Sequence, residues 1–130
     1  MNPTPISATQ HGIDDYLFSA AQFLVPARLG VNQKAVNLYR LLGSNLLLYN
    51  LLTDYPAGVS TAPADWPGAF AVVPYRTHRL IDIASVSGLA LLSFHKAIRT
   101  DKRMLPFHIG YTALAALHIV LTDWRTNQLA

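Results

Sequence analysis

Apolar stretches of helical length alternate with short polar or basic segments along most of this chain. The pattern predicts four helices, separated by two basic loops and one connector rich in Pro, Gly and Ala. The predicted helices span residues 14–30, 36–54, 77–98 and 105–124, with a Pro-containing leader at 1–11 and the connector at 56–77. Asp14 and Asp15 suit the first turn of the first helix. Pro26 is expected to kink or end that helix, because proline removes a backbone hydrogen bond.

The two halves of the chain resemble each other. Ile13-Asp14 opens the first half and Ile81-Asp82 opens the second, while Leu52-Thr53-Asp54-Tyr55 and Leu121-Thr122-Asp123-Trp124 close them. A repeated two-helix unit predicts a pseudo-symmetric arrangement of four helices. We therefore expect one domain over 1–130, with repeats at about 13–55 and 78–124.

Composition favours a membrane protein. Hydrophobic residues make up 52% of the chain and charged residues only 13%, about half the share usual in a soluble domain. Residues 104–122 carry no charged side chain and approach the length of about 20 residues that crosses a bilayer. No predicted helix has the wide charged face of a soluble bundle. The predicted fold class is an all-α, four-helix transmembrane bundle of two tandem repeats; the alternative is a compact soluble bundle with an apolar exterior.

Charge distribution predicts an orientation. The net charge is +3, and the basic residues concentrate in the loops between the first two and the last two helices. The positive-inside rule places both loops in the cytoplasm, and the termini and the connector in the periplasm, of a bacterial inner membrane. The basic loops are expected to contact anionic lipid, and nucleic acid is not an expected partner. The absence of cysteine excludes disulfides and Cys-based metal sites.

Folding each predicted hairpin about its loop brings polar residues together at the periplasmic end. Besides His118, this predicted cluster contains Asp14, Asp54, His78, Arg79, Asp82 and Asp123. We interpret it as structural, with an Arg79–Asp123 ion pair and an Asp82–His118 hydrogen bond. The alternative is a proton site or a site for iron, zinc or manganese. No Glu-x-x-His or His-Glu-x-x-His spacing is present, so no metal is predicted.

Three histidines are candidate cofactor ligands. His95 and His108 fall at one depth on neighbouring predicted helices, where they can ligate a haem or a chlorophyll-type pigment, and His118 lies further along the last helix. The alternative, which we favour, is that His95 and His108 lie at the interface beside the basic loop. The cofactor therefore stays unknown.

Several landmarks resemble a known family. The segments His78-Arg79-Leu80-Ile81-Asp82, Pro106-Phe107-His108-Ile109-Gly110 and Leu121-Thr122-Asp123-Trp124 are similar to those of bacterial SPW-repeat membrane proteins. The Ser-Pro-Trp tripeptide itself is absent; Ser93-Phe94-His95 and Ser19-Ala20-Ala21 stand near its expected places. The resemblance implies a duplicated pair of membrane helices and no particular activity.

No nucleophile elbow or phosphate-binding glycine loop is found, so the chain is not expected to be an enzyme. We expect a non-catalytic accessory or scaffolding subunit that packs, in lipid, against other subunits of a larger respiratory or photosynthetic membrane complex. One alternative is a haem- or pigment-binding electron-transfer protein. Others are a small transporter or proton-coupled channel, and a soluble helical enzyme.

Overall fold

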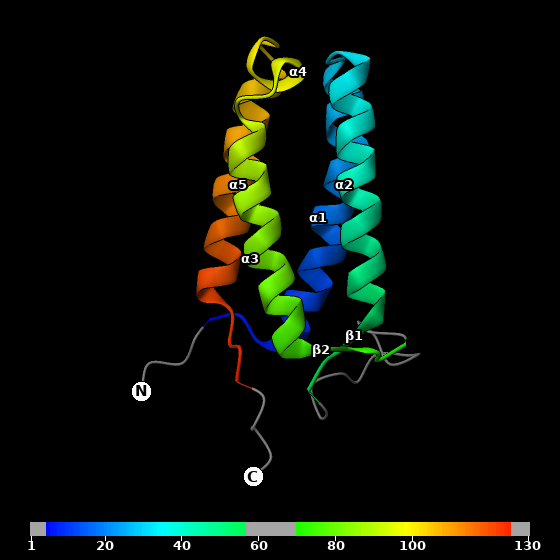
Figure 1. Cartoon of the computed structure of the whole chain (residues 1–130), viewed down its shortest axis with the longest axis vertical. Coiled ribbons are helices and arrows are strands. Elements are labelled where there is room, and N and C mark those ends of the chain that lie inside the picture. Colours follow the sequence, from blue (N-terminus) through cyan, green and yellow to red (C-terminus); the bar gives the residue numbers. More distant parts are fainter. Residues whose placement is uncertain (1–4, 57–69, 126–130) are drawn as a thin grey trace.

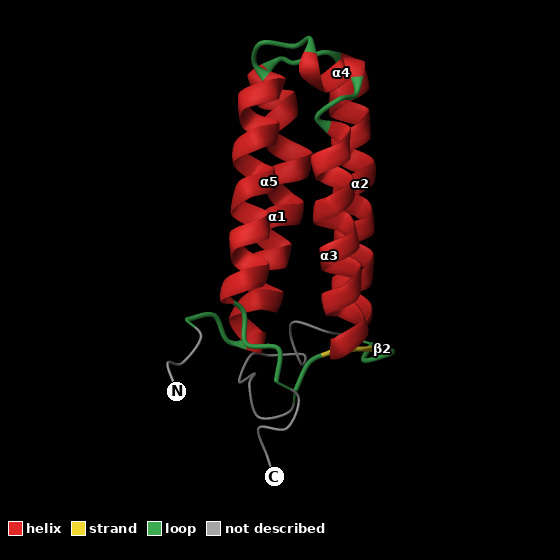
Figure 2. Cartoon of the chain, turned by 60° about the vertical axis from the view of Figure 1, so that its left-hand side comes forward, coloured by secondary structure: helices red, strands yellow, loops and turns green. Residues whose placement is uncertain are grey.

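The computed structural model describes residues 5–56 and 70–125, and these are overwhelmingly helical, which confirms the all-α class. Four long helices stand side by side (Figures 1 and 2). The long helices are α1 (Ala8–Leu29), α2 (Gln33–Leu52), α3 (Tyr75–Leu92) and α5 (Met104–Leu121), and a short helix α4 (Lys96–Arg99) lies between α3 and α5. Two short strands, β1 (Thr53–Asp54) and β2 (Val73–Pro74), pair in parallel.

Helix α1 begins six residues before the predicted start at residue 14, so the expectation of a loose leader up to residue 11 is wrong for residues 8–11. Ser7 caps the helix, its hydroxyl accepting a hydrogen bond from the Gln10 N–H at 3.1 Å. Asp14 and Asp15 consequently lie beyond the first turn. Pro26 does not end the helix: α1 continues to Leu29 and stops where Gly30 adopts a left-handed φ of 64°.

Helix α3 is shorter than predicted. The helix expected over 77–98 ends at Leu92, and the chain turns before α4 begins at Lys96. His95 is the N-cap of α4, and its ring nitrogen accepts from the Ala97 N–H at 3.2 Å. The residue thus belongs to the loop at the tip of the second hairpin, not to a long helix face.

The two hairpin tips lie at the same end of the molecule, as the helix pattern predicts (Figure 1). Asn32, the N-cap of α2, joins them: its side-chain amide donates to the Ala97 carbonyl at 2.7 Å, and its backbone N–H donates to Asp101 at 2.9 Å. The other Asp101 carboxylate oxygen accepts from the backbone N–H groups of Arg103 and Met104. These hydrogen bonds hold the pKa of Asp101 down at about 2, the Asn32 N–H contributing most.

The apolar core lies below the tips and draws on both hairpins. Its buried members are Val31, Ala35, Val36, Tyr39, Leu89, Ala97, Ile98, Met104 and Tyr111. Helices α1 and α2 approach closely at Gly43, where an added Cβ would lie 3.1 Å from the Gln22 Cβ and from the Phe23 ring. The Ser19 hydroxyl also donates to the Gly43 carbonyl at 2.8 Å. A small residue at this position is what lets the two backbones meet.

Short strand contacts close the opposite end. Thr53 pairs with Val73 in the β1–β2 ladder, and Ile6 forms an isolated parallel bridge with Thr122. In each half, therefore, the threonine that follows the second long helix leaves the helix and enters an extended contact. The sequence did not predict these contacts. They matter because they fix the two threonines beneath the site described next.

Candidate functional site

Each half contributes a histidine and an aspartate spaced four residues apart near the start of its first helix. In α1 these are His11 and Asp15; in α3 they are His78 and Asp82. Residues four apart lie on one helix face, so each pair points inward together. The sequence comparison matched Asp14 with Asp82. The structural counterpart of Asp82 is instead the next residue, Asp15. We call His11, Asp15, His78 and Asp82 the His–Asp quartet.

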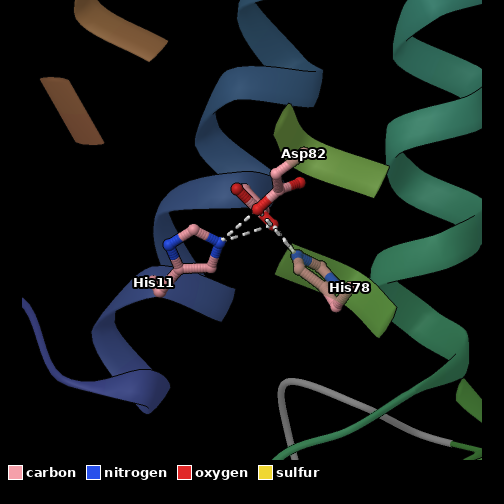
Figure 3. Close-up of side chains that lie close together, drawn as sticks. His11, His78 and Asp82 are labelled. Carbon is pink, nitrogen blue, oxygen red and sulfur yellow. Dashed lines mark hydrogen bonds and ion pairs between the residues drawn. The ribbon is translucent and has the colours of Figure 1, made fainter. Parts of the chain in front are cut away.

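The quartet is buried and closely packed. Nε2 of His11 lies 2.9 Å from Oδ2 of Asp82 and 3.5 Å from Oδ2 of Asp15. Nε2 of His78 lies 3.0 Å from the same Asp15 oxygen and 3.3 Å from the same Asp82 oxygen. Figure 3 shows the imidazoles of His11 and His78 pointing at the Asp82 carboxylate from different sides. The contact between α1 and α3 here is thus made by ionisable groups.

Two threonines hold the outer nitrogens of the imidazoles. Oγ1 of Thr53 lies 2.6 Å from Nδ1 of His78, and Oγ1 of Thr122 lies 2.8 Å from Nδ1 of His11. Each threonine hydroxyl also donates to the helix carbonyl four residues earlier, at Tyr49 and His118. The two halves therefore supply the same three residue types in the same roles.

The surroundings of the quartet differ between the halves. The Tyr49 hydroxyl donates to Oδ1 of Asp82 at 2.9 Å, whereas Nε2 of His118 pairs with Oδ2 of Asp14 at 3.1 Å. The expected Asp82–His118 hydrogen bond is accordingly wrong. The His118 ring instead stacks on His11, with centroids 4.2 Å apart and planes 12° from parallel.

The predicted polar cluster is brought together only in part. His78 and Asp82 belong to the quartet, and Asp14 lies beside it through His118. Asp54 is exposed on β1. Asp123 binds Arg125, with a shortest distance of 2.5 Å, and the Arg79 guanidinium lies 5.9 Å from the centre of the Trp124 ring. His11 and Asp15, two of the four central residues, were absent from the predicted cluster.

The candidate tetrapyrrole ligands do not form a pair. His95 is an exposed residue of the hairpin tip. His108 is buried, and both its ring nitrogens have partners: Nδ1 lies 2.6 Å from the Tyr39 hydroxyl, and Nε2 lies 2.9 Å from the Leu89 carbonyl. Neither nitrogen of His108 is left free for an iron or magnesium ion. The structure thus contains no His95–His108 ligand pair, and buried His108 does not lie at an exposed interface as expected. His118, the third candidate, lies beside the quartet with its Nε2 paired to Asp14.

A cavity of about 600 Å³ adjoins the quartet between the hairpins. Its polar end is formed by Asp15, Asp82 and Tyr49, and most of its remaining wall is apolar. Gln22 also lines it, and its side-chain oxygen is buried without a hydrogen-bond partner among the described residues. The two quartet carboxylates thus border a partly open cavity.

No protein-family model, curated protein or solved structure matches this chain, so the site is interpreted from its own geometry. A His or Asp ligand atom from each quartet member lies within 4.8 Å of all the others. Two imidazoles and two carboxylates at this distance can share protons or hold one cation. Thr53 and Thr122 are not activated as nucleophiles by the quartet histidines, because each hydroxyl donates its proton to a helix carbonyl.

Proposed function

We propose that this protein is a small polytopic membrane protein without catalysis of its own. It forms a four-helix transmembrane bundle from two tandem two-helix repeats and acts as an accessory or scaffolding subunit of a larger membrane complex, such as a respiratory or photosynthetic assembly. This agrees with the resemblance to SPW-repeat membrane proteins, which rests on sequence landmarks alone. The observation that carries the proposal is the reversed distribution of polar and apolar side chains.

Large apolar side chains point outward from every long helix, with exposed fractions of 60% for Leu41, 71% for Leu91 and 75% for Val120. Further exposed examples are Leu17, Leu24, Leu48, Leu80, Ile109, Leu114 and Leu117. Conversely, His11, Asp15, Gln22, Asn50, His78, Asp82, His108 and His118 are buried. Apolar outside and polar inside is the arrangement expected of a chain covered by lipid or by apolar partners.

Helix length fits a bilayer. The long helices contain 18 to 22 residues, so they rise about 27 to 33 Å, against about 30 Å of hydrocarbon. By length and composition, α5 is the one described helix that qualifies as a span. Mean hydropathy is lower in the other three helices because they carry buried polar residues, such as the quartet and Asn50, and also exposed polar ones, such as Arg40 and Arg79. The segments 16–27, 41–52, 83–92 and 104–121 contain no Asp, Glu, Lys or Arg.

Loop charge supports the orientation already expected. Both hairpin tips lie at one end (Figure 1), and they carry most of the basic residues, including Lys34, Arg99, Lys102 and Arg103. The proposed topology puts these tips in the cytoplasm of a bacterium. The quartet, the chain termini and the 56–77 connector then lie toward the periplasm.

A groove between α1 and α5 is the proposed contact for another subunit. It has a volume of about 630 Å³, and apolar residues such as Leu17, Phe107 and Leu114 line it. Gly110 lies on this groove, and a Cβ built there meets nothing within 4 Å. The surface is therefore open and mostly apolar, with a small residue at Gly110 where another helix could approach closely.

The test is carbonate extraction of native membranes, followed by a mild-detergent pull-down of the tagged chain. We expect the chain to stay in the pellet and to co-purify with a larger complex. Gly110→Leu, which fills the groove, is expected to abolish co-purification, while the matched control Leu48→Phe on α2 keeps it. Release by carbonate, or recovery as a lone monomer with its own turnover, contradicts the proposal.

A second candidate, a small transporter or proton-coupled channel, is favoured by the cavity beside Asp15 and Asp82. Ionisable groups inside a membrane domain often mark an ion path. Flux of protons or small solutes into liposomes that contain only this protein supports the transporter or channel. Liposomes without such flux favour the scaffolding role.

A further inference from the structure

We propose that the His–Asp quartet binds one divalent transition-metal ion of the zinc type. The ligands are Nε2 of His11, Nε2 of His78, Oδ2 of Asp15 and Oδ2 of Asp82. The site goes beyond the proposed scaffolding role, because it assigns a bound metal to residues that tie α1 to α3.

The threonines fix which nitrogen of each imidazole carries its proton. The Thr53 hydroxyl has one proton, and it is directed to the Tyr49 carbonyl at 2.6 Å. Toward His78 the hydroxyl can therefore only accept, so Nδ1 of His78 must be the N–H. The same reasoning applies to Thr122 and His11, with the His118 carbonyl as acceptor. In the neutral form, both Nε2 atoms then present a lone pair to the centre of the quartet.

Lone pairs facing carboxylate oxygens need a positive charge between them. The Nε2–Oδ2 distance is 2.9 Å for His11 and Asp82 and 3.0 Å for His78 and Asp15, and two bare acceptors at this separation repel. Either protons or a cation must fill the centre. Two carboxylates and two neutral imidazoles carry a charge of −2, so one divalent ion makes the buried group neutral. Burial of an uncompensated charge would be far more costly.

The spacing matches a four-coordinate ion. With metal–ligand bonds of about 2.0–2.1 Å, tetrahedral ligand atoms lie about 3.3 Å apart. The four N–O distances across the quartet are 2.9, 3.0, 3.3 and 3.5 Å. These four separations thus lie within a few tenths of an ångström of the tetrahedral value, and all four ligand atoms lie within 4.8 Å of one another. The threonine hydroxyls complete the arrangement, since ligating histidines almost always donate their other N–H to an oxygen.

The donor set selects the class of metal. Two imidazoles and two carboxylates without sulfur suit Zn²⁺, Co²⁺, Fe²⁺ or Mn²⁺, whereas Ca²⁺ and Mg²⁺ prefer all-oxygen shells with more ligands. A compact set of four protein ligands favours Zn²⁺. With all four tetrahedral positions filled by protein ligands, such a site is structural. Two ligands come from each half of the chain, so the metal joins the halves.

The test uses the full chain in mild detergent, treated with a chelator and then titrated with Co²⁺ as a spectroscopic probe. We expect uptake of one Co²⁺ per chain, visible absorption typical of four-coordinate cobalt, and displacement by Zn²⁺. Nitrogen-15 NMR of labelled histidine locates the ion without mutation: two of the five imidazoles should show metal-bound Nε2 signals. A folded wild-type chain that takes up neither metal overturns the proposal. In that case two protons lie between the imidazoles and the carboxylates of the quartet.

Variants provide the second measurement. Asp82→Asn is expected to abolish stoichiometric uptake, whereas Asp54→Asn, which changes an exposed acid at the same end, retains it. His95→Gln serves in the same way as the histidine control. Equal uptake by Asp82→Asn and wild type overturns the assignment. If Asp82→Asn does not fold, the histidine NMR signals of the wild type still decide, because metal-shifted signals from any other pair of histidines place the ion elsewhere.

Discussion

Thr53 hydrogen-bonds to the Nδ1 atom of His78 across 2.6 Å, although the two residues belong to different helical hairpins. The contact exists because Thr53 lies where α2 passes into β1, so its hydroxyl reaches both the last turn of its own helix and the first turns of α3. Thr122 repeats the relationship with His11. Each histidine of the quartet is therefore held at its Nδ1 atom by the residue that follows another long helix.

Replacing this hydroxyl should be costly. Thr53→Val keeps the shape of the side chain but leaves the buried Nδ1–H of His78 without an acceptor, which costs about 1–3 kcal/mol of unfolding free energy. In metal titrations the same variant should bind about 10–100-fold more weakly. Thr112→Val is the matched control, because the buried Thr112 hydroxyl has no hydrogen-bond partner in the part of the chain that the structure describes, and its loss should be neutral or stabilising. Denaturation in detergent gives the measurement; equal losses for both variants contradict the assigned role.

Asp101 should make stability depend on pH at the hairpin tips. Its pKa in the folded protein is about 2, against an ordinary value of 3.8, so it contributes stability above about pH 4 that disappears as the pH falls toward 2. Asp101→Ala should lose about 1 kcal/mol at neutral pH, as expected for the loss of its hydrogen bonds from backbone N–H groups, and should show a smaller decline between pH 4 and 2. Asp54→Ala is the control. Parallel pH profiles for wild type and Asp101→Ala would count against this anchor.

Gly43 should not tolerate a side chain. Gly43→Ala places a methyl group 3.1 Å from Gln22 and Phe23, where close packing cannot yield freely, and should cost about 1–3 kcal/mol. Gly110→Ala makes the same change where nothing lies within 4 Å, and should leave stability unaltered or slightly raised. Melting temperatures of the two purified variants provide the comparison. A Gly43→Ala protein as stable as wild type would show that α1 and α2 can separate without loss.

The proposed topology can be tested with single cysteines, since the natural chain has none. Lys102→Cys marks the exposed hairpin tip and Asp54→Cys marks the exposed opposite end. In intact spheroplasts, a maleimide that cannot cross membranes should label Cys at position 54 and spare position 102 until the cells are lysed. The reverse pattern would invert the orientation, and equal labelling of both in intact cells would argue against a spanning bundle.

The existence and order of the long helices could be predicted from sequence because each is an apolar stretch of helical length between loops. The residues at which the helices begin and end were harder to predict. His11 lies in a polar segment that resembles a leader, and only the Ser7 cap reveals that the helix already covers it. The break before His95 has no proline or glycine to announce it.

The site was predicted in part for a related reason. Asp82 and His78 stand out as polar residues beside an apolar helix, whereas His11 and Asp15 become visible only when the two His-x-x-x-Asp pairs are compared. The sequence comparison matched Asp82 with Asp14 instead of Asp15, and this one-residue shift hid the repeated pattern. The role of Thr53 and Thr122 depends on a contact between hairpins, which no local pattern encodes.

The division of the quartet between α1 and α3 has a consequence for biosynthesis. The ribosome delivers His11 and Asp15 with the first hairpin, before His78 and Asp82 emerge, so the early hairpin carries an imidazole and a carboxylate without their partners from the second half. Under the proposed membrane topology, a nascent chain halted in the connector should therefore insert poorly and be a substrate for quality-control proteases. Completion of α3 is the event that converts this exposed intermediate into a protein the cell can keep.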